Sequence, residues 1–257
     1  MSVPLSVCIL ARDEEEQLGR CLDAVSFADE IVVVVDDRSA DGTEKLARER
    51  AQVVDVRPYA GDVAQKRHCT SLARNDWILV LDPDELLTDR AAREVRARVA
   101  AGEDAACGFE INRVTWHLGR WIRHGDFYPD WKLRLFRRSR ARWVGTDPHA
   151  RVEVDGPVER LSGEIQHFSY RDLADQIERI QFFSEQTAAA LAREGRRARL
   201  SDLVLRPPAR FLRAYVLKRG FLDGVPGLVI AVATAFHVFL KYAKLWERQH
   251  PDLSPPP

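Results

Sequence analysis

Several features of familiar protein classes are missing from this 257-residue sequence. It has only four cysteines, and no two of them form a C-x-x-C pair. They stand in apolar runs, so we expect buried free thiols in a reducing compartment and not disulfides or a zinc site. The formal net charge is zero, because 39 Lys and Arg residues balance 39 Asp and Glu residues. The whole-chain charge therefore gives no reason to expect nucleic-acid binding.

The sequence also lacks a basic segment followed by a long apolar stretch near its start. No secretory signal is predicted, and we expect a cytoplasmic location. It has no internal repeat and no low-complexity tract apart from Pro255 to Pro257. The balance of 46% hydrophobic and 30% charged residues is that of a globular protein. A chain of this length can bury one large core, or one core with a small appendage.

Short apolar runs alternate with segments of helical periodicity in the first hundred residues. The runs predict strands that end before polar clusters, and the segments between them predict helices. The second run, residues 31–35, is continuously apolar, as in a parallel strand that is buried on both faces. Thr88 is a candidate cap for the fourth helix. This alternation predicts a doubly wound α/β sheet with ligands at the carboxyl ends of its strands. The four predicted strands are residues 3–10, 31–35, 53–56 and 77–81.

The pattern changes after Cys107. Further strands are predicted over residues 109–114, 131–136 and 149–154, and a helix over 173–191. A basic amphipathic helix over residues 206–220 and a very apolar one over 226–246 follow. We therefore predict a catalytic domain over residues 1–170 and a helical extension over 171–257.

Asp82-Pro83-Asp84-Glu85 directly follows the fourth predicted strand. Two carboxylates with one residue between them, at a strand end, are able to bind a hard divalent cation. Such a cation would stabilise a leaving diphosphate. The alternative is a solvated acidic turn or a cap for the next helix. The position at the end of a buried strand favours the metal site.

Two more polar clusters follow neighbouring strands. Asp36 begins the cluster at residues 36–43, where a carboxylate is able to accept a hydrogen bond from the imide N–H of uracil. The alternative is that Ser39 or Asp41 caps the helix that follows. Arg12-Asp13-Glu14 follows the first strand. Three clusters on consecutive strands predict one ligand-binding edge.

The sequence resembles family-two glycosyltransferases, and within them the subgroup of lipopolysaccharide core synthesis. The resemblance covers residues 7–246, nearly the whole chain. The matching stretches are R-D-E at 12–14, A-D-E-I-V-V-V-V-D-D-R-S-A-D-G-T at 28–43, A-Q-K at 64–66, W-I-L-V-L-D-P-D-E at 77–85, L-G-R-W-I-R-H-G at 118–125, Y-P-D at 128–130, L-R-L-F-R-R at 133–138, V-E-V-D-G at 152–156 and F-L-K-Y-A-K-L-W-E at 239–247.

The resemblance implies a GT-A fold, inversion at the anomeric carbon, and a nucleotide-sugar donor such as a UDP-hexose. It implies a divalent cation, Mg²⁺ or Mn²⁺, with Asp84 as main ligand, Asp82 at the ribose or metal, and His149 as third ligand. Asp130 is the candidate general base, which takes the proton of the acceptor hydroxyl. The residues assigned to the donor are Arg12, Glu14, Asp36, Lys66, Asp82, Arg134 and Arg137.

The sequence departs from the family pattern at three positions. Ala150 stands where a glutamate usually follows the histidine, so Asp147 or Glu153 would have to replace a base or acceptor contact. Asp13 stands in place of a usual asparagine, and Arg38 in place of a small residue. These departures bear on the donor preference and on catalytic competence. His117, His124 and His167 are interpreted as structural or surface residues.

The last part of the chain is basic. From Arg193 onward there are twelve basic and five acidic residues. Residues 227–240 are almost entirely apolar, yet fourteen helical residues reach only about 21 Å, short of the bilayer core. We expect peripheral attachment to the inner face of the cytoplasmic membrane. The alternative is a buried packing helix or a dimer contact, which leaves an oligomer open.

The predicted function is hexose transfer to a membrane-borne saccharide, or glycolipid, such as lipopolysaccharide core. Two alternatives remain open at this point. One is transfer to a polyprenyl phosphate, an acceptor that needs less base catalysis. The other is a catalytically weakened homologue that serves as a membrane-bound binding protein.

Overall fold

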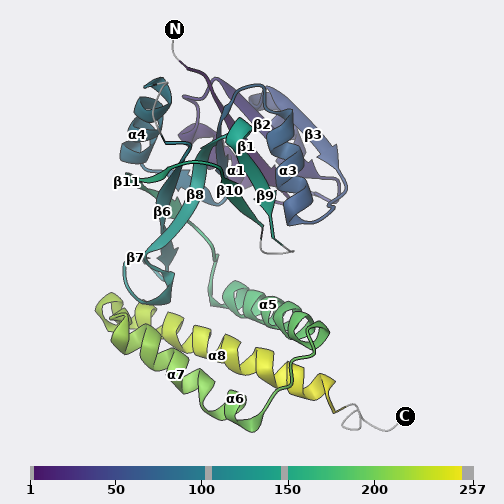
Figure 1. Cartoon of the computed structure of the whole chain (residues 1–257), viewed down its shortest axis with the longest axis vertical. Coiled ribbons are helices and arrows are strands. Elements are labelled where there is room, and N and C mark those ends of the chain that lie inside the picture. Colours follow the sequence, from purple (N-terminus) through teal and green to yellow (C-terminus); the bar gives the residue numbers. More distant parts are fainter. Residues whose placement is uncertain (1–2, 102–105, 146–149, 251–257) are drawn as a thin grey trace. The chain divides into compact units, whose positions relative to one another are not determined.

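The computed structural model describes residues 3–101, 106–145 and 150–250. The chain divides into two compact units (Figure 1). Unit 1 comprises Met1–Arg113 and Asp130–His167, and unit 2 comprises Val114–Pro129 and Phe168–Pro257. The second unit therefore includes a segment from the middle of the chain, which a single division after residue 170 does not separate.

Four parallel strands form one half of the sheet in unit 1, in the order β3-β2-β1-β4. Every residue of β2 and β4 is buried, as expected for parallel strands that are covered on both faces. The doubly wound α/β prediction is confirmed. The four strands are β1 (Leu5–Ala11), β2 (Glu30–Asp36), β3 (Val53–Arg57) and β4 (Trp77–Leu81).

The sheet continues from β4 with antiparallel strands, in the order β8-β6-β11-β5. The strands predicted near residues 109–114 and 131–136 are present and longer than expected. Sequence reasoning missed β5, β7 and β11, as well as β9 (Ala141–Val144), which pairs with β10 (Arg151–Val154). The remaining bounds are β5 (Glu85–Leu87), β6 (Gly108–His117), β7 (Arg120–Ile122), β8 (Asp130–Arg137) and β11 (Val158–His167).

Two apolar clusters cover the two faces of this sheet. Helices α1 (Glu15–Ala24), α2 (Thr43–Arg50) and α4 (Asp89–Ala100) contribute to one cluster. Helix α3 (Asp62–Leu72) and the β9–β10 ribbon contribute to the other. Because side chains alternate along a strand, Val7 and Ile9 of β1 face the first cluster and Cys8 faces the second.

Local chemistry agrees with these elements. The Thr88 side chain accepts a hydrogen bond from the Ala91 amide and caps α4, as predicted. All four cysteines are free thiols, and Cys8, Cys21 and Cys69 are buried. Burial raises the pKa of the Cys21 thiol, so it stays protonated at neutral pH.

Unit 2 is mainly helical. Its long helices are α5 (Leu173–Arg193) and α8 (Gly224–Arg248), joined by α6 (Leu200–Val204) and α7 (Arg206–Leu212). Buried acids tie the segment 114–129 to these helices: Asp126 pairs with Arg210 and Lys218. The 3₁₀ turns are η1 (Gly125–Phe127) in that segment, η4 (Gly220–Asp223) before α8 and, in unit 1, η2 (Arg138–Arg140).

The single helix predicted over residues 206–220 is wrong in its second half. After α7 the chain forms a π-helical turn, η3 (Arg213–Leu217), and then leaves the helix through Arg219 in a left-handed conformation (φ 56°). Gly220 packs so closely that a Cβ would lie 2.7 Å from the Ala214 carbonyl oxygen. Only glycine fits there, and the helix ends.

Candidate functional site

The polar clusters after β1, β2 and β4 meet at one edge of the sheet. Ala11 of β1 pairs with Val35 of β2, and Ile9 of β1 pairs with Leu81 of β4. The carboxyl ends of these parallel strands are therefore adjacent, as the sequence predicted. The loops after β1 and β2 also bind each other. The Glu14 amide donates to Thr43 Oγ1 at 2.9 Å, and the Ala40 amide donates to Asp13 Oδ1 at 2.7 Å.

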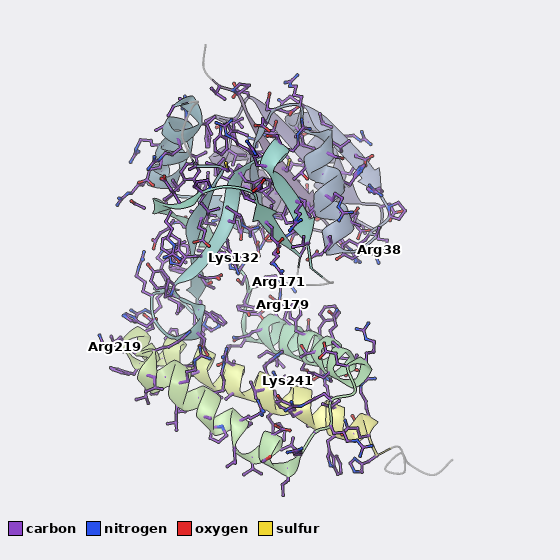
Figure 2. The ribbon with its side chains drawn as sticks, in the orientation of Figure 1. Arg38, Lys132, Arg171, Arg179, Arg219 and Lys241 are labelled. Carbon is purple, nitrogen blue, oxygen red and sulfur yellow. The ribbon has the colours of Figure 1, made fainter. Side chains whose placement is uncertain are left out.

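Asp36, the last residue of β2, is held by two arginines. Arg38 Nε and Nη2 donate to its two carboxylate oxygens at 2.9 and 2.6 Å, and Arg12 Nη1 lies 4.0 Å away. Arg38 is shown in Figure 2. Its hydrogen bonds outweigh the effect of burial and lower the pKa of Asp36 to about 2. The residue predicted to read the base is thus an ionised carboxylate that is already paired.

Asp82 and Glu85 share a buried arginine. Arg134 Nη2, on β8, lies 2.8 Å from Asp82 Oδ2 and 2.5 Å from Glu85 Oε1. Lys66 Nζ, on α3, lies 3.5 Å from Asp82 Oδ1. Burial would raise the pKa of Asp82, but Arg134 and Lys66 outweigh it and hold that pKa well below its usual range. Asp82 is therefore ionised at neutral pH.

The predicted base belongs to the same network. Arg113, on β6, donates from Nε to Asp130 Oδ2 at 2.9 Å and from Nη1 to Glu85 Oε1 at 3.0 Å. Lys132 Nζ lies 2.9 Å from Asp130 Oδ1 (Figure 2). Burial by itself would raise the pKa of Asp130. The charges and hydrogen bonds of Arg113 and Lys132 have the larger effect, so the pKa of Asp130 is lowered. Asp130 is held in place and ionised, and its role as base stays a prediction.

His167 contacts Asp84. His167 is the last residue of β11 and pairs with Glu85, the first residue of β5. Its Nε2 lies 3.2 Å from Asp84 Oδ2. Sequence reasoning set this histidine aside as structural or on the surface. No local motif signals the contact, because it depends on the antiparallel register of two strands that the sequence did not predict.

The donor set at this edge suits a hard divalent cation. Asp82 and Asp84 offer carboxylate oxygens, which Mg²⁺ and Mn²⁺ prefer, and His167 adds a nitrogen beside Asp84. Within the described ranges, no three or more His, Cys, Asp and Glu residues are grouped as a metal site by themselves. A cation there would need further oxygens, such as those of a diphosphate. His149, the predicted third ligand, lies outside the described residues.

The two arginines of β8 that were assigned to the donor, Arg134 and Arg137, lie in different places. Arg134 is buried beside Asp82. Arg137 pairs with Trp77 at the start of β4, the end of the strand away from Asp82, and lies over the Trp77 ring and near Asp76. Because a strand of five residues separates Arg137 from the acidic edge, we omit it from the proposed donor site.

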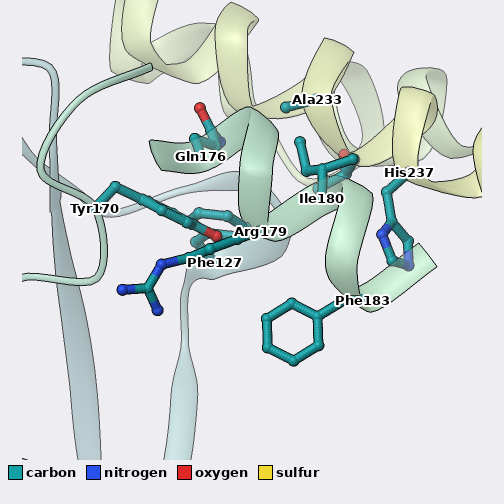
Figure 3. Close-up of a pocket in the computed structure, with 9 residues that line it drawn as sticks. Phe127, Tyr170, Gln176, Arg179, Ile180, Phe183, Ala233 and His237 are labelled. Atoms are coloured by element: carbon teal, nitrogen blue, oxygen red, sulfur yellow. The ribbon is translucent and has the colours of Figure 1, made fainter. Parts of the chain in front are cut away.

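Unit 2 holds a separate pocket of about 230 Å³ (Figure 3). The stacked rings of Phe127 and Tyr170 line it together with residues of α5 and α8, and Arg179 and His237 add polar groups. Burial and the charge of Lys241 lower the pKa of His237, so its ring is neutral at physiological pH. Sequence reasoning did not predict this pocket.

The parallel sheet of unit 1, with polar loops at the carboxyl ends of its strands, has the architecture of a GT-A type α/β fold. The chain belongs to a known family, because the model described as "Glycosyl transferase family 2" matches residues 6–154. It is therefore a transferase of sugars, and the resemblance inferred from the sequence is confirmed.

Curated relatives agree with this family. The lipopolysaccharide core biosynthesis glycosyltransferase LpsC of Rhizobium meliloti is 28% identical, over 96% of this chain and 93% of LpsC. The uncharacterized glycosyltransferase RT0209 of Rickettsia typhi is 29% identical, over 95% of this chain and 87% of RT0209.

Solved structures show more distant likeness. The structure of residues 1–349 of TarS from S. aureus aligns over 97% of this chain and 92% of the TarS chain, with 12% identity and a TM-score of 0.45. Glucosyl-3-phosphoglycerate synthase of Mycobacterium tuberculosis covers 43% of this chain, with 43% of it covered, 19% identity and a TM-score of 0.35.

Proposed function

We propose that this protein transfers a hexose, with inversion, from a UDP-hexose to a membrane-borne saccharide such as lipopolysaccharide core. One observation carries the proposal: at the acidic edge of unit 1, Asp82 pairs with Lys66 and is linked through Arg134, Glu85 and Arg113 to Asp130. Asp84 follows Asp82 in the chain, and Asp36 ends a strand at the same edge of the sheet. The name of the relative LpsC supports a lipopolysaccharide acceptor.

The donor half of the site would lie on β1, β2 and β4. Arg12, Glu14 and Asp36 would line the base, and Lys66 lies close enough to Asp82 to face a diphosphate. A divalent cation held by Asp84 and Asp82 would neutralise the leaving diphosphate. Arg134 keeps Asp82 ionised and oriented, because it bridges that carboxylate to the fully buried Glu85.

The acceptor half would centre on Asp130. Its carboxylate would take the proton of the acceptor hydroxyl as that oxygen attacks the anomeric carbon. Arg113 fixes the position of this carboxylate from the side of Glu85. Asp130 has a lowered pKa, which makes it a weak base in the free protein. An acceptor that displaces Lys132 from Asp130 would remove one source of that lowering.

Unit 2 would attach the enzyme to the cytoplasmic face of the membrane. Exposed apolar residues recur along α8 at spacings of three, four and seven, and therefore share one face of the helix. Gly220–Arg248 is long and apolar enough to cross a membrane, by length and composition alone. Lys241 and Arg219, labelled in Figure 2, are among the basic residues of this unit. The apolar residues of the α8 face are Val225, Leu228, Val232, Phe236, Phe239 and Trp246.

Replacement of one carboxylate tests the donor site. Asp84→Asn removes a charge that would bind the cation, and we expect the metal-dependent release of UDP from UDP-hexose to fall by at least about 100-fold. Asp89→Asn is the matched control, since it removes the same charge from an exposed position at the start of α4. Unchanged UDP release in Asp84→Asn would count decisively against the proposed site.

A further inference from the structure

A pocket of about 450 Å³ in unit 2 is lined mainly by arginines. It lies where the chain passes from α5 through α6 into α7. Its charged lining residues are Asp202 and four arginines, a net charge of +3. No part of the proposed transfer reaction uses this pocket. The arginines are Arg196, Arg197, Arg199 and Arg206.

The only carboxylate of the lining is fully engaged by the protein itself. Asp202 is buried, and it accepts from the Arg199 amide at 3.0 Å and from Arg206 Nε at 2.5 Å. Arg196 Nη2 lies a further 3.8 Å from the same carboxylate. Asp202 therefore positions two guanidinium groups, and its single charge leaves most of the positive charge uncompensated.

Two arginines remain without such a partner. Within the described part of the chain, neither Arg197 nor Arg199 has a carboxylate oxygen within ion-pair distance, and both are exposed. Guanidinium groups bind phosphate through paired N–H donors, and more strongly than neutral donors do. The pocket thus offers unused donors of the type that phosphate groups prefer.

The loop that carries these arginines is held by its backbone. The Gln249 side chain accepts from the Ala198 amide at 3.1 Å and donates to the Arg196 carbonyl at 2.8 Å. Gly195 has φ 72° and ends α5, and the Arg196 amide returns to the Leu191 carbonyl at 3.0 Å. A site with a fixed backbone loses less entropy when it binds a ligand.

Exposed apolar residues are next to these arginines in the sequence. Leu200, Val204 and Leu205, on and directly after α6, are 74%, 56% and 63% exposed. A charged pocket beside exposed aliphatic side chains matches an amphiphile whose phosphate binds the arginines and whose chains contact the leucines and valine.

We propose that this pocket binds a phosphomonoester group, carried by a lipid headgroup or by a lipid-borne saccharide. The assignment of this phosphomonoester to a lipid rests on the proposed membrane attachment of unit 2. The binding of phosphate itself does not depend on that attachment. A phosphomonoester carries up to two negative charges near neutral pH, whereas a phosphodiester carries one. A site with a net charge of +3 therefore favours the phosphomonoester.

The test compares two double variants of the full chain. Arg197→Gln/Arg199→Gln removes the unpaired arginines and keeps the partners of Asp202. Arg193→Gln/Arg213→Gln removes the same charge from exposed positions of unit 2 that do not line the pocket. Calorimetry with inorganic phosphate forms one arm. Co-sedimentation with vesicles forms the other arm. One set of phosphatidylcholine vesicles contains phosphatidic acid and the other contains phosphatidylglycerol, in amounts that give the same surface charge.

We expect the wild type and the control to prefer phosphatidic acid, and the pocket variant to bind it at least about tenfold more weakly. A second outcome is that inorganic phosphate binds to the wild type and the control but not to the pocket variant, while vesicles with phosphatidic acid and with phosphatidylglycerol bind equally well. In that case the ligand is a soluble phosphomonoester. If the pocket variant matches the control in both arms, the proposal is wrong. UDP release by the pocket variant is expected to be normal, so this result and that of Asp84→Asn are independent.

Discussion

At the scale of single residues, the carboxylates of unit 1 are balanced by its own cations. Arg38 pairs with Asp36, Arg134 with Asp82 and Glu85, and Arg113 with Glu85 and Asp130. A buried charge is costly unless it is paired, and these pairs offset that cost. They also reduce the negative potential that a diphosphate would meet as it approaches.

Removal of the shared arginine should destabilise unit 1. Arg134→Met leaves Glu85, which is fully buried, with only Arg113, and leaves Asp82 with Lys66. We expect a loss of about 3 kcal/mol in the free energy of unfolding, measured by urea denaturation. The double variant Arg134→Met/Glu85→Gln should recover part of that loss, because the uncompensated charge is gone. A double variant less stable than the sum of both single changes would contradict this account.

The clamp on Asp36 predicts a dependence on pH. The pKa of Asp36 is about 2, below its ordinary 3.8, so its ion pair stabilises the protein fully above the ordinary pKa. That contribution is lost as the pH falls from about 4 to about 2. Arg38→Gln should lower the stability only slightly at neutral pH, because the Arg38 side chain is 55% exposed and solvent screens its ion pair.

Urea denaturation of the wild type and Arg38→Gln checks this dependence. The stability difference should shrink in acid, where Asp36 is protonated in both proteins. Arg48→Gln is the control, since its pair with Glu44 is exposed on both sides. If the difference in the free energy of unfolding between the wild type and Arg38→Gln is constant down to about pH 2, Arg38 does not act through the charge of Asp36.

The strand pattern predicted the site residues that follow parallel strands. Asp130 and Arg134, which reach the site from β8, were assigned through the family resemblance, and Arg113 and His167 were missed. Asp36, Asp82 and Asp84 each end or follow a parallel strand, so one local pattern and one general rule placed them. Glu85, Arg113 and His167 depend on antiparallel register between segments far apart in the chain. No local periodicity encodes that register. The sequence therefore grouped Arg137 with Arg134 at the donor, although Arg137 pairs with Trp77 at the other end of β4.

At the scale of elements, α4 and β11 illustrate how a helix is fixed to the sheet. Glu94 of α4 accepts from the amides of Ser162 and Gly163 at 2.7 and 3.0 Å. Gly163 approaches α4 so closely that a Cβ there would lie 2.3 Å from the Ala91 Cα. The contact places α4 beside the strand that ends in His167.

Gly163→Ala should therefore disturb this packing. Both the helix backbone and the strand would have to shift, and we expect a loss of about 2–3 kcal/mol in the free energy of unfolding. Gly19→Ala is the matched change inside α1, where a Cβ would meet only Leu46 at 3.6 Å, an ordinary contact. It should stabilise the protein by up to about 1 kcal/mol, because alanine favours the helix. Thermal denaturation measures both, and equal effects of the two changes would contradict the close approach.

The strands that sequence reasoning missed are short or polar. β5 has three residues, and β11 alternates exposed residues with buried Leu161, Gly163 and Ile165. That alternation is a strand pattern, but a glycine occupies one of its buried positions and carries no apolar signal. The parallel strands were found because burial on both faces makes them continuously apolar.

At the scale of the whole molecule, the chain forms its helical unit from two separate segments. Asp223, which is buried, accepts from the amides of Arg123 and His124 at 3.0 and 2.7 Å. These bonds connect residues about a hundred positions apart. A boundary drawn from composition follows the chain in order, so a division after residue 170 does not group these two segments.

The exposed apolar residues of unit 2 provide the last prediction. Leu217 and Val225 are 77% and 71% exposed. Contact of each with lipid would contribute about 1.5–3 kcal/mol. Leu217→Asp/Val225→Asp should therefore weaken binding to vesicles that contain phosphatidylglycerol by at least about 100-fold, measured by co-sedimentation. UDP release from UDP-hexose in solution should not change, because unit 1 holds the proposed donor site.

The control carries the same kind of change on the other unit. Val158→Asp replaces an exposed valine of β11 in unit 1, and its vesicle binding should equal that of the wild type. Size-exclusion chromatography of the double variant separates the two uses of an apolar face. If the wild type is an oligomer and the double variant a monomer with unchanged vesicle binding, the α8 face joins copies of the chain and does not contact lipid. Loss of vesicle binding at an unchanged oligomeric state supports membrane attachment, because the apolar area then acts on lipid alone.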